Sequence, residues 1–163
     1  MVAVSFRALV ITVSDRSSRG ERPDVSGPLL ASLLRESGIE VGDPVVVPDE
    51  VAAIQTLLRE GALAYDLVVT TGGTGLAPRD VTPEATRPLL DAEVPGIAEA
   101  LRHRNAETVP TAVLSRGLAG TIGRVLVVNL PGSTGGVRDG VAVLGPVLDH
   151  ALSQLRGGGD HDG

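Results

Sequence analysis

The sequence predicts an α/β fold in which a mostly parallel sheet carries helices on both faces. Four short apolar runs rich in β-branched residues are typical of strands that are covered on both sides. Segments with the periodicity of amphipathic helices separate these runs. Strands that alternate with helices indicate right-handed βαβ units. Aromatic residues make up only 1% of the chain, which predicts a core of aliphatic side chains.

The expected elements follow one another in a regular order. Strands are expected at residues 6–13, 41–47, 66–71 and 125–130, and helices at residues 28–37, 50–62, 81–90, 94–106 and 137–155. Thr82-Pro83-Glu84 places a capping hydroxyl, a first-turn proline and an early acid in the order that begins a helix. Gly38 and Gly61 stand where helices are expected to stop. We therefore expect one domain over residues 1–156 and a disordered tail over residues 157–163.

The composition argues against several classes of function. The chain has 163 residues and a net charge of −6, and all 14 of its basic residues are Arg, which argues against nucleic acid or an anionic membrane as a partner. The lack of Cys excludes disulfides, thiol catalysis and Cys-ligated zinc. No apolar run approaches the roughly 20 residues that span a bilayer. The first residues also lack the pattern of a signal peptide. We expect a soluble, cytoplasmic protein.

Polar segments follow the predicted strands at the points where those strands end. They are Ser14-Asp15-Arg16, Pro48-Asp49-Glu50, residues 70–80 and residues 129–133. Ligands of open parallel sheets bind beyond the carboxyl ends of the strands, near a reversal in strand order. The four segments therefore predict one composite site at that edge of the sheet.

The glycine-rich loop directly after the strand at residues 66–71 is a candidate phosphate site. In Thr71-Gly72-Gly73-Thr74-Gly75, the glycines allow backbone N–H groups to approach an anion, and Thr71 and Thr74 can add hydroxyl donors. The loop is neither a Walker loop, since the chain has no Lys, nor a dinucleotide fingerprint. Taken alone, it could equally be a tight turn between a strand and a helix.

Two carboxylates follow neighbouring strands beside this loop. Asp49 precedes one predicted helix and Asp80 precedes another, so each could simply cap a helix N-terminus. As a pair beside an anion loop, they suit Mg²⁺-assisted phosphoryl chemistry better than either does alone.

Other polar segments allow two interpretations. Asp15 and Arg16 either contribute to the site or form a surface ion pair. Ser115-Arg116 either offers a hydroxyl and a guanidinium to phosphate or forms a solvated turn. Residues 129–133 either cap a helix or supply an anion site at its N-terminus, and these two roles are compatible. His103, His150 and His161 lack the spacing of metal ligands.

The chain resembles the MogA/MoaB family of molybdenum-cofactor biosynthesis, which includes the gephyrin G domain and its plant counterpart. The motifs that carry the resemblance span about residues 10–155. They are Thr12-Val13-Ser14-Asp15, Asp24-Val25-Ser26-Gly27-Pro28, Val47-Pro48-Asp49-Glu50, Gly72-Gly73-Thr74-Gly75, Arg79-Asp80-Val81-Thr82-Pro83-Glu84-Ala85-Thr86, Pro95-Gly96, Leu114-Ser115-Arg116, Ala119-Gly120 and Asn129-Leu130-Pro131-Gly132-Ser133. Thr134 stands where the family often has Pro, which implies a more flexible loop there.

The resemblance implies a molybdopterin adenylyltransferase: an enzyme that uses ATP and Mg²⁺ to adenylylate molybdopterin and releases pyrophosphate. It implies a three-layer, Rossmann-like α/β fold, assembled as a homotrimer. It also implies a product that accepts molybdate in the next step, so that handover to a molybdate-insertion protein is expected. Asp49 and Asp80 correspond to the residues tied to catalysis and metal use. The implied substrate and phosphate contacts are Ser14, Asp15, Ser26, Gly27, Thr71, Gly72, Gly73, Thr74, Gly75, Arg79, Thr82, Glu84, Ser115, Arg116, Pro131, Gly132 and Ser133.

Two other roles compete with this one. The MoaB branch includes members without adenylyltransferase activity, so a non-catalytic molybdopterin-binding or scaffold protein is the main alternative. The retention of both Asp49 and Asp80 favours the active branch. A phospho-acceptor regulator of doubly wound fold fits poorly, because the chain has no Lys for a receiver-type site.

Overall fold

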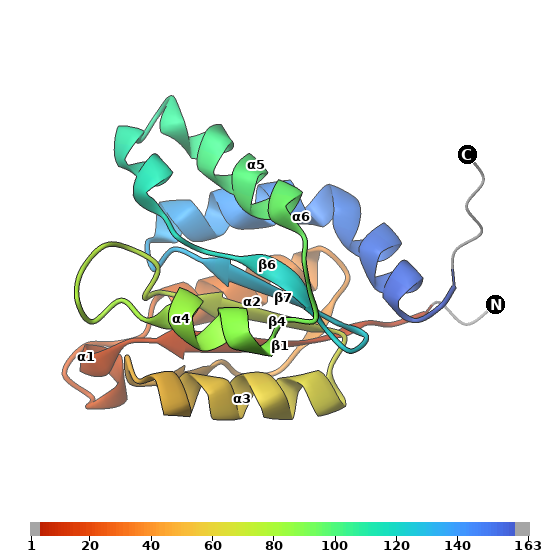
Figure 1. Cartoon of the computed structure of the whole chain (residues 1–163), viewed down its shortest axis with the longest axis horizontal. Helices are drawn as coiled ribbons and strands as arrows, with labels where there is room; N and C mark the ends of the chain where they lie inside the picture. Colours follow the sequence, from red (N-terminus) through yellow and green to blue (C-terminus); the bar gives the residue numbers. More distant parts are fainter. Residues whose placement is uncertain (1–3, 159–163) are drawn as a thin grey trace.

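Seven strands form one sheet at the centre of the computed structural model, which describes residues 4–158 except for the side chain of Asn105 (Figure 1). The strands are β1 (Arg7–Val13), β2 (Glu40–Val41), β3 (Val45–Val47), β4 (Leu67–Thr71), β5 (Ala92–Glu93), β6 (Ala119–Ile122) and β7 (Val125–Leu130). The helices are α1 (Asp15–Ser18), α2 (Ser26–Glu36), α3 (Val51–Ala64), α4 (Thr82–Thr86), α5 (Pro95–Ala106) and α6 (Thr134–Leu155), and the 3-10 helices are η1 (Arg87–Leu89) and η2 (Pro110–Leu114).

The order in which the chain adds strands to the sheet reverses between β1 and β4. The order is β2-β1-β4-β7-β6-β5, and β3 also pairs with β1. The chain leaves β1 toward β2 and β3 on one side, then returns through α3 to β4 on the other side of β1. Strands β1, β2, β3, β4 and β7 are parallel, whereas β6 is antiparallel to β7 and β5 is antiparallel to β6. The carboxyl ends of β1 and β4 therefore flank the position where such sheets bind ligands.

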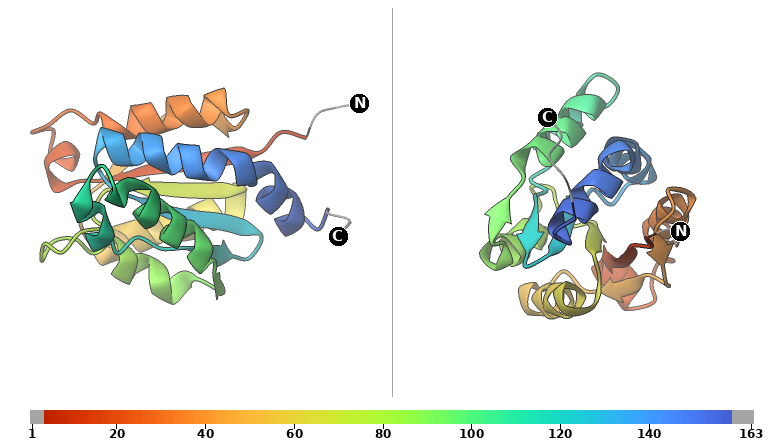
Figure 2. Two further views of the ribbon diagram at one scale, coloured as in Figure 1. Left: turned by 90° about the horizontal axis from the view of Figure 1, so that it is seen from above. Right: turned by 90° about the vertical axis from the view of Figure 1, so that its right-hand side faces the viewer.

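Helices cover both faces of the sheet, as the sequence predicts (Figures 1 and 2). Alternate residues of β1 point to opposite faces. Ala8 and Val10 pack with side chains of α2, α5 and α6, while Leu9, Ile11 and Val13 pack with side chains of α3 and α4. Both cores are built almost entirely from aliphatic side chains, which confirms the expectation from the scarcity of aromatic residues.

Most predicted elements are present, with shifted ends. The expected strand at residues 41–47 is split into β2 and β3, and Pro44, which has no N–H to donate, lies between them. The helix expected from residue 28 begins at Ser26, and the one expected from residue 137 begins at Thr134, after Ser133 caps it. The helix expected at residues 81–90 is the short α4 followed by η1.

Four short elements were missed: β5, β6, α1 and the 3-10 helix η2. Strands β5 and β6 have two and four residues, and β6 contains Gly120 and Thr121 rather than an apolar run. Helix α1 has only four residues and none of them is buried, so no apolar face marks it. Most of the tail expected at residues 157–163 lies outside the described residues. No helix within residues 4–158 combines the length and the hydropathy needed to cross a membrane.

Candidate functional site

A cavity of about 670 Å³ lies at the carboxyl ends of β1 and β4, at the reversal in strand order. Its walls come from the segments that follow β1, β3, β4 and β7, which confirms that these four segments converge. The predicted site residues that line it are Ser14, Asp15, Ser26, Asp49, Thr71, Gly72, Gly73, Arg79, Asp80, Gly132 and Ser133.

The glycine-rich loop needs glycine at two positions for conformational reasons. Gly72 and Gly73 have φ angles of 102° and 69°, a region that residues with a side chain rarely adopt. A Cβ atom at Gly72 would collide with the carbonyl oxygen of Val13, and one at Gly73 with Oγ1 of Thr82. The loop is thus pressed against β1 and α4 so tightly that only hydrogen fits.

Hydrogen bonds fix this loop and leave part of its backbone free. The N–H of Gly72 donates to the carbonyl of Leu130 at 3.0 Å. The hydroxyl of Thr71 donates to the carbonyl of Pro131 at 2.8 Å, and that of Thr82 to the carbonyl of Gly72 at 2.9 Å. These two hydroxyls therefore shape the loop instead of offering protons to a ligand.

The N–H groups of Gly73, Thr74 and Gly75 donate to no protein acceptor within residues 4–158. Consecutive free N–H groups in a loop with left-handed residues form a concave site for an anion. The Thr74 side chain itself is buried. The backbone of the loop, rather than its hydroxyls, is therefore the part that can hold phosphate.

Asp15 and Asp49 hold one another by a reciprocal pair of hydrogen bonds. The N–H of Asp15 donates to Oδ2 of Asp49 at 2.9 Å, and the N–H of Asp49 donates to Oδ1 of Asp15 at 2.8 Å. Glu50, not Asp49, is the N-cap residue of α3, and it makes no capping bond with its side chain. Asp15 and Arg16 form no ion pair with each other in the described structure. Asp15 is thus not part of a surface ion pair with Arg16, and Asp49 is not a helix cap.

The Asp49 carboxylate lies in unfavourable surroundings for a negative charge. Burial raises the pKa of Asp49, and the charges of Asp15 and Asp80 raise it further, against the lowering effects of the Asp15 N–H and of Arg79. Carboxylates gathered in this way are typical of functional sites. A cation bound beside them would relieve the repulsion.

Asp80 lies in a loop and does not cap α4. Its Oδ2 accepts the N–H of Ala77 at 3.1 Å, while Val81 is the N-cap residue of α4 and makes no side-chain cap. Within residues 4–158, no group of three or more His, Asp or Glu side chains is arranged to hold a metal ion. Asp49 and Asp80 could therefore supply only part of a metal's ligands. This matches Mg²⁺, which takes one or two carboxylates together with water and substrate phosphates.

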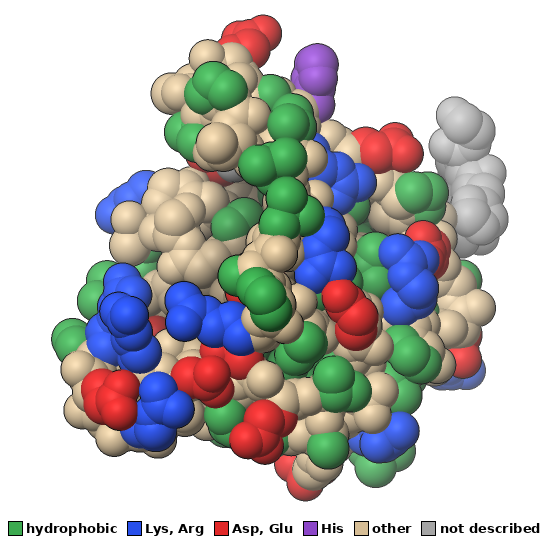
Figure 3. Space-filling view, turned by 60° about the vertical axis from the view of Figure 1, so that its left-hand side comes forward, with side chains coloured by type: hydrophobic (Ala, Val, Ile, Leu, Met, Phe, Trp, Pro, Cys, Tyr) green, Lys and Arg blue, Asp and Glu red, His purple; other side chains and the backbone are tan. Residues whose placement is uncertain are grey.

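Three arginines line the same cavity: Arg16, Arg22 and Arg79. None of them forms an ion pair in the described structure, although five other arginines do. Basic and acidic side chains gather side by side on the face toward which the carboxyl ends of the strands point (Figure 3). Arg22 and Asp24 were not predicted as site residues. Asp24 belongs to the motif at residues 24–28 that carries the family resemblance, whereas no sequence signal marks Arg22, which only the fold brings in.

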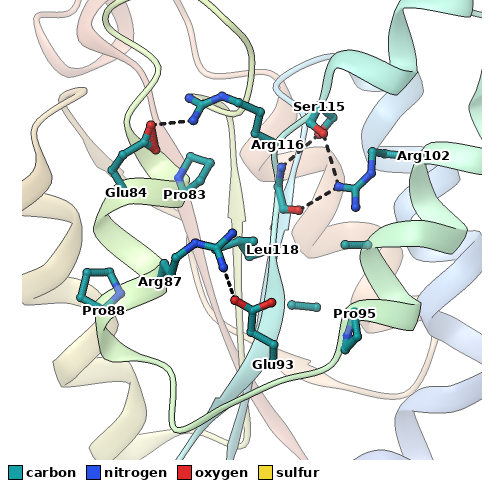
Figure 4. Close-up of a pocket in the computed structure, with 13 residues that line it drawn as sticks. Pro83, Glu84, Arg87, Pro88, Glu93, Pro95, Arg102, Ser115, Arg116 and Leu118 are labelled. Atoms are coloured by element: carbon teal, nitrogen blue, oxygen red, sulfur yellow. Dashed lines mark hydrogen bonds and ion pairs between the residues drawn. The ribbon is translucent and has the colours of Figure 1, made fainter.

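A second hollow of about 730 Å³ is lined by residues of α4, η1 and α5 and by residues 115–119, and it takes three predicted residues: Glu84, Ser115 and Arg116 (Figure 4). Two ion pairs line it, one between Arg116 and Glu84 at 2.6 Å and one between Arg87 and Glu93. Most of the predicted site residues thus fall into two neighbouring hollows.

Five predicted residues line neither hollow: Gly27, Thr74, Gly75, Thr82 and Pro131. Gly27 donates its N–H to Asp24 at 3.0 Å, and Ser133 caps α6 by accepting the N–H of Gly136 at 3.0 Å, as one interpretation predicted. Pro131 lines a small space of about 30 Å³. Thr134 begins α6 and also lines the first cavity. His103 and His150 are exposed, and His161 lies outside the described residues.

Comparison with known proteins identifies the fold class first. The crystal structure of the molybdopterin biosynthesis enzyme MoaB from Thermus thermophilus superposes with a TM-score of 0.87 and 49% identity, over 93% of this chain and 97% of that one. A molybdopterin biosynthesis protein from Mycobacterium abscessus has a TM-score of 0.88 at 49% identity, again over 93% and 97% of the two chains. The chain therefore has the MoaB/MogA-type α/β fold.

The sequence comparisons then define the family. Residues 9–150 match the family described as "Probable molybdopterin binding domain". The chain is 40% identical to molybdenum cofactor biosynthesis protein B of Staphylococcus aureus, over 93% of this chain and 92% of that protein. It spans only 22% of the length of gephyrin from Dictyostelium discoideum and 48% of a bifunctional molybdenum cofactor biosynthesis protein from Synechococcus elongatus. The chain belongs to this molybdopterin-binding-domain family of molybdenum cofactor biosynthesis proteins.

Proposed function

We propose that the chain is a Mg²⁺-dependent molybdopterin adenylyltransferase, which transfers the AMP group of ATP to molybdopterin and releases pyrophosphate. One observation carries the proposal: Asp49 and Asp80 share a cavity with Gly73, whose N–H donates to no protein acceptor within residues 4–158, and with arginines that have no ion-pair partner in the described structure. This combination suits phosphoryl transfer, in which a protein mainly positions polyanions and stabilises charge.

The reaction needs no covalent intermediate with the protein. An oxygen of the terminal phosphate of molybdopterin attacks the α-phosphorus of ATP, a P–O bond forms there, and the bond to the β-phosphate oxygen breaks as pyrophosphate leaves. The loop N–H groups that begin at Gly73 donate to phosphate oxygens, and Arg16, Arg22 and Arg79 offset the charge of the departing pyrophosphate. These local donors act against the net charge of −6 of the whole chain.

Asp49 and Asp80 are the residues that would hold Mg²⁺, directly or through water. The donor set fits this ion, because both side chains offer carboxylate oxygens. Burial, and then the charges of Asp15 and Asp80, raise the pKa of Asp49, and a cation would offset that cost of its negative charge. Bound Mg²⁺ would neutralise charge on the phosphates. Asp15 keeps the Asp49 carboxylate in place through the reciprocal bonds, so Asp15 is a supporting residue rather than a phosphate contact.

The second hollow offers a place for the remainder of a large substrate. Its walls include Arg102, Ser115 and Leu118, so that it combines polar groups with an apolar surface (Figure 4). Asp80 lines the first cavity, and its carbonyl accepts a bond from Arg116, which lines the second. The reacting phosphates would lie near Asp80. We assign the triphosphate to the cavity at Gly73 and the pterin to the second hollow.

A non-catalytic molybdopterin-binding protein is the competing function, because several of the similar structures are named MoaB. One experiment separates the two functions. The chain is incubated with ATP, Mg²⁺ and molybdopterin, and adenylylated pterin and pyrophosphate are measured. Formation of both products in equal amounts supports the enzyme, whereas pterin binding without either product identifies the binder.

The assembly and surroundings are proposed from the family. We place the protein in the cytoplasm as a homotrimer that passes its product to a molybdate-insertion protein. Sedimentation of the purified chain tests the trimer, and transfer of adenylylated pterin to a candidate partner tests the handover.

A further inference from the structure

Protein acceptors occupy all three nitrogens of the Arg116 guanidinium. Its Nε donates to the carbonyl of Gly75 at 2.8 Å, its Nη2 to the carbonyl of Asp80 at 2.8 Å, and its Nη1 to Oε1 of Glu84 at 2.6 Å. Its backbone N–H donates to the carbonyl of Thr74, also at 2.8 Å. A guanidinium has a fixed planar fork of donors, so this set of bonds defines one orientation.

The acceptors bracket an exposed segment of the loop. Residues 76–79 are all exposed, and Gly75 and Asp80 stand at its two ends. The other bonds that hold this segment are internal to it: Asp80 accepts the N–H of Ala77 through Oδ2 and donates its own N–H to the Ala77 carbonyl at 2.9 Å. Internal bonds fix the shape of the segment but not its place on the protein. Arg116 joins both ends to another part of the fold.

Arg116 is itself firmly placed. Nη1 of Arg102, on α5, donates to the carbonyls of Ser115 and Gly117 at 3.3 and 3.1 Å, which are the residues on either side of Arg116 (Figure 4). The next residue, Leu118, donates its N–H to the buried Asn129 side chain at 3.1 Å. A connected series of bonds therefore runs from α5 and β7 through Arg116 to the loop.

We infer that Arg116 is a positioning residue that fixes Asp80 for the reaction, and that it is not a phosphate ligand. The inference rests on the proposed function for its catalytic consequence, but the fixing of the loop does not depend on it. Without the guanidinium, the segment at residues 76–80 keeps its internal turn and loses its side-chain attachment to the rest of the fold. The Asp80 carboxylate then samples positions away from the phosphates.

The test measures loop opening and turnover in the same variants. Arg116→Ala and Arg116→Lys should each raise the amide hydrogen-exchange rates of Thr82 and of position 116, whose N–H groups donate to the carbonyls of Gly73 and Thr74 at the base of the loop, by about tenfold, roughly the effect of losing one net hydrogen bond. The value of kcat should fall by about 100-fold, as for a misplaced reactive group, with a smaller change in the KM for ATP. Lys keeps the charge but lacks the planar fork, so it should not rescue kcat.

Arg35→Ala is the matched control, because Arg35 also donates to two backbone carbonyls, those of Val41 and Gly42, away from the site. It should leave loop exchange and kcat unchanged. Unchanged exchange in Arg116→Ala would overturn the inference. So would a raised KM with normal kcat, or full rescue by Lys, since both indicate a charge that binds phosphate. Faster exchange in a chain whose wild type shows no turnover would support the positioning role and count against the proposed enzyme instead.

Discussion

The two ends of the central sheet place acidic side chains in opposite surroundings. At the amino end of β4, Asp66 accepts two bonds from Arg156, at 2.9 and 2.8 Å, and one from the N–H of Arg7 at 2.9 Å. Burial acts to raise the pKa of Asp66, but the bonds and charges of Arg156 and Arg7 outweigh it and lower the pKa below its usual value. At the carboxyl end, burial raises the pKa of Asp49, and the charges of Asp15 and Asp80 raise it further.

The arginines at the amino end have partners within the protein, whereas those that line the cavity at the carboxyl end form no ion pair in the described structure. Arg156 also stacks over the ring of Phe6 at 4.4 Å and Arg7 over that of Tyr65 at 5.0 Å, so the amino end satisfies both its charges and its aromatic residues. Arg16, Arg22 and Arg79 at the carboxyl end have no such partner in the described structure. One end is arranged for stability, and the other keeps its charges available for a ligand.

The largest expected effect is on turnover. Asp80→Ala should lower turnover by about 100-fold or more, since it removes a metal-holding carboxylate, and should leave molybdopterin binding largely intact. Turnover is measured at saturating Mg²⁺ and binding by calorimetry. Wild-type turnover under those conditions would remove Asp80 from the metal site.

A bulky residue in the glycine-rich loop should weaken the binding of phosphorylated ligand. Gly73→Val forces a side chain against Oγ1 of Thr82 at a φ of 69°, and we expect the Kd for ATP to rise by about tenfold through the loss of one or more loop donors. Gly38→Val is the control, because Gly38 has a φ of 86° with open space around it. Calorimetry that finds normal affinity in Gly73→Val would exclude the loop from the site.

At the other end of the sheet, the expected effect is on stability. Asp66→Asn should lower the free energy of unfolding by about 1 kcal/mol, a value reduced for the partial exposure of Arg156, and should leave turnover unchanged. The folded-state pKa of Asp66 is lowered, so its stabilisation is present above the unfolded-state value near pH 4 and is lost as pH falls through the folded-state value. Denaturant unfolding of both proteins at pH 7 and pH 3 should show the difference shrinking, and a constant difference would contradict this assignment.

The smallest expected effect is a gain in stability on substitution of Asp49. Because the pKa of Asp49 is raised, its ionised form opposes folding at neutral pH, and protonation removes that cost. Asp49→Asn should therefore raise the free energy of unfolding at pH 7 by less than about 0.5 kcal/mol, with no gain below the ordinary Asp pKa near 4. The exposed Asp43 provides a control substitution. A loss of stability in Asp49→Asn at pH 7 would show that the carboxylate contributes to folding.

The sequence predicted the fold class and the four strand ends because these depend on local signals. Apolar runs mark β1, β4 and β7, and the segments after β1, β3, β4 and β7 do meet at one cavity. The antiparallel pair β5 and β6 escaped prediction, since two and four residues cannot display a periodic pattern.

Side-chain roles were harder to predict than positions. Nothing in the sequence shows that the donors of Arg116 are taken by Gly75, Asp80 and Glu84, because those bonds join residues between 32 and 41 positions apart. The same holds for Asp15 and Asp49, 34 positions apart, whose reciprocal bonds replace a helix cap. Arg22 enters the cavity only because the fold brings its loop there. Long-range pairing decides whether a charged side chain is free to bind, and composition and spacing do not encode it.

The most direct test of the contrast between the two ends compares Asp80→Asn with Asp66→Asn in one experiment. Each substitution removes one negative charge: Asp80→Asn at the carboxyl end of the sheet, and Asp66→Asn at its amino end. Adenylylated molybdopterin formed from ATP is measured together with the free energy of unfolding. We predict that Asp80→Asn abolishes nearly all product with unfolding close to wild type, and that Asp66→Asn forms normal product from a less stable protein. If both variants lost product equally, or if neither lost any product, the assignment of catalysis to one end and stability to the other would be contradicted.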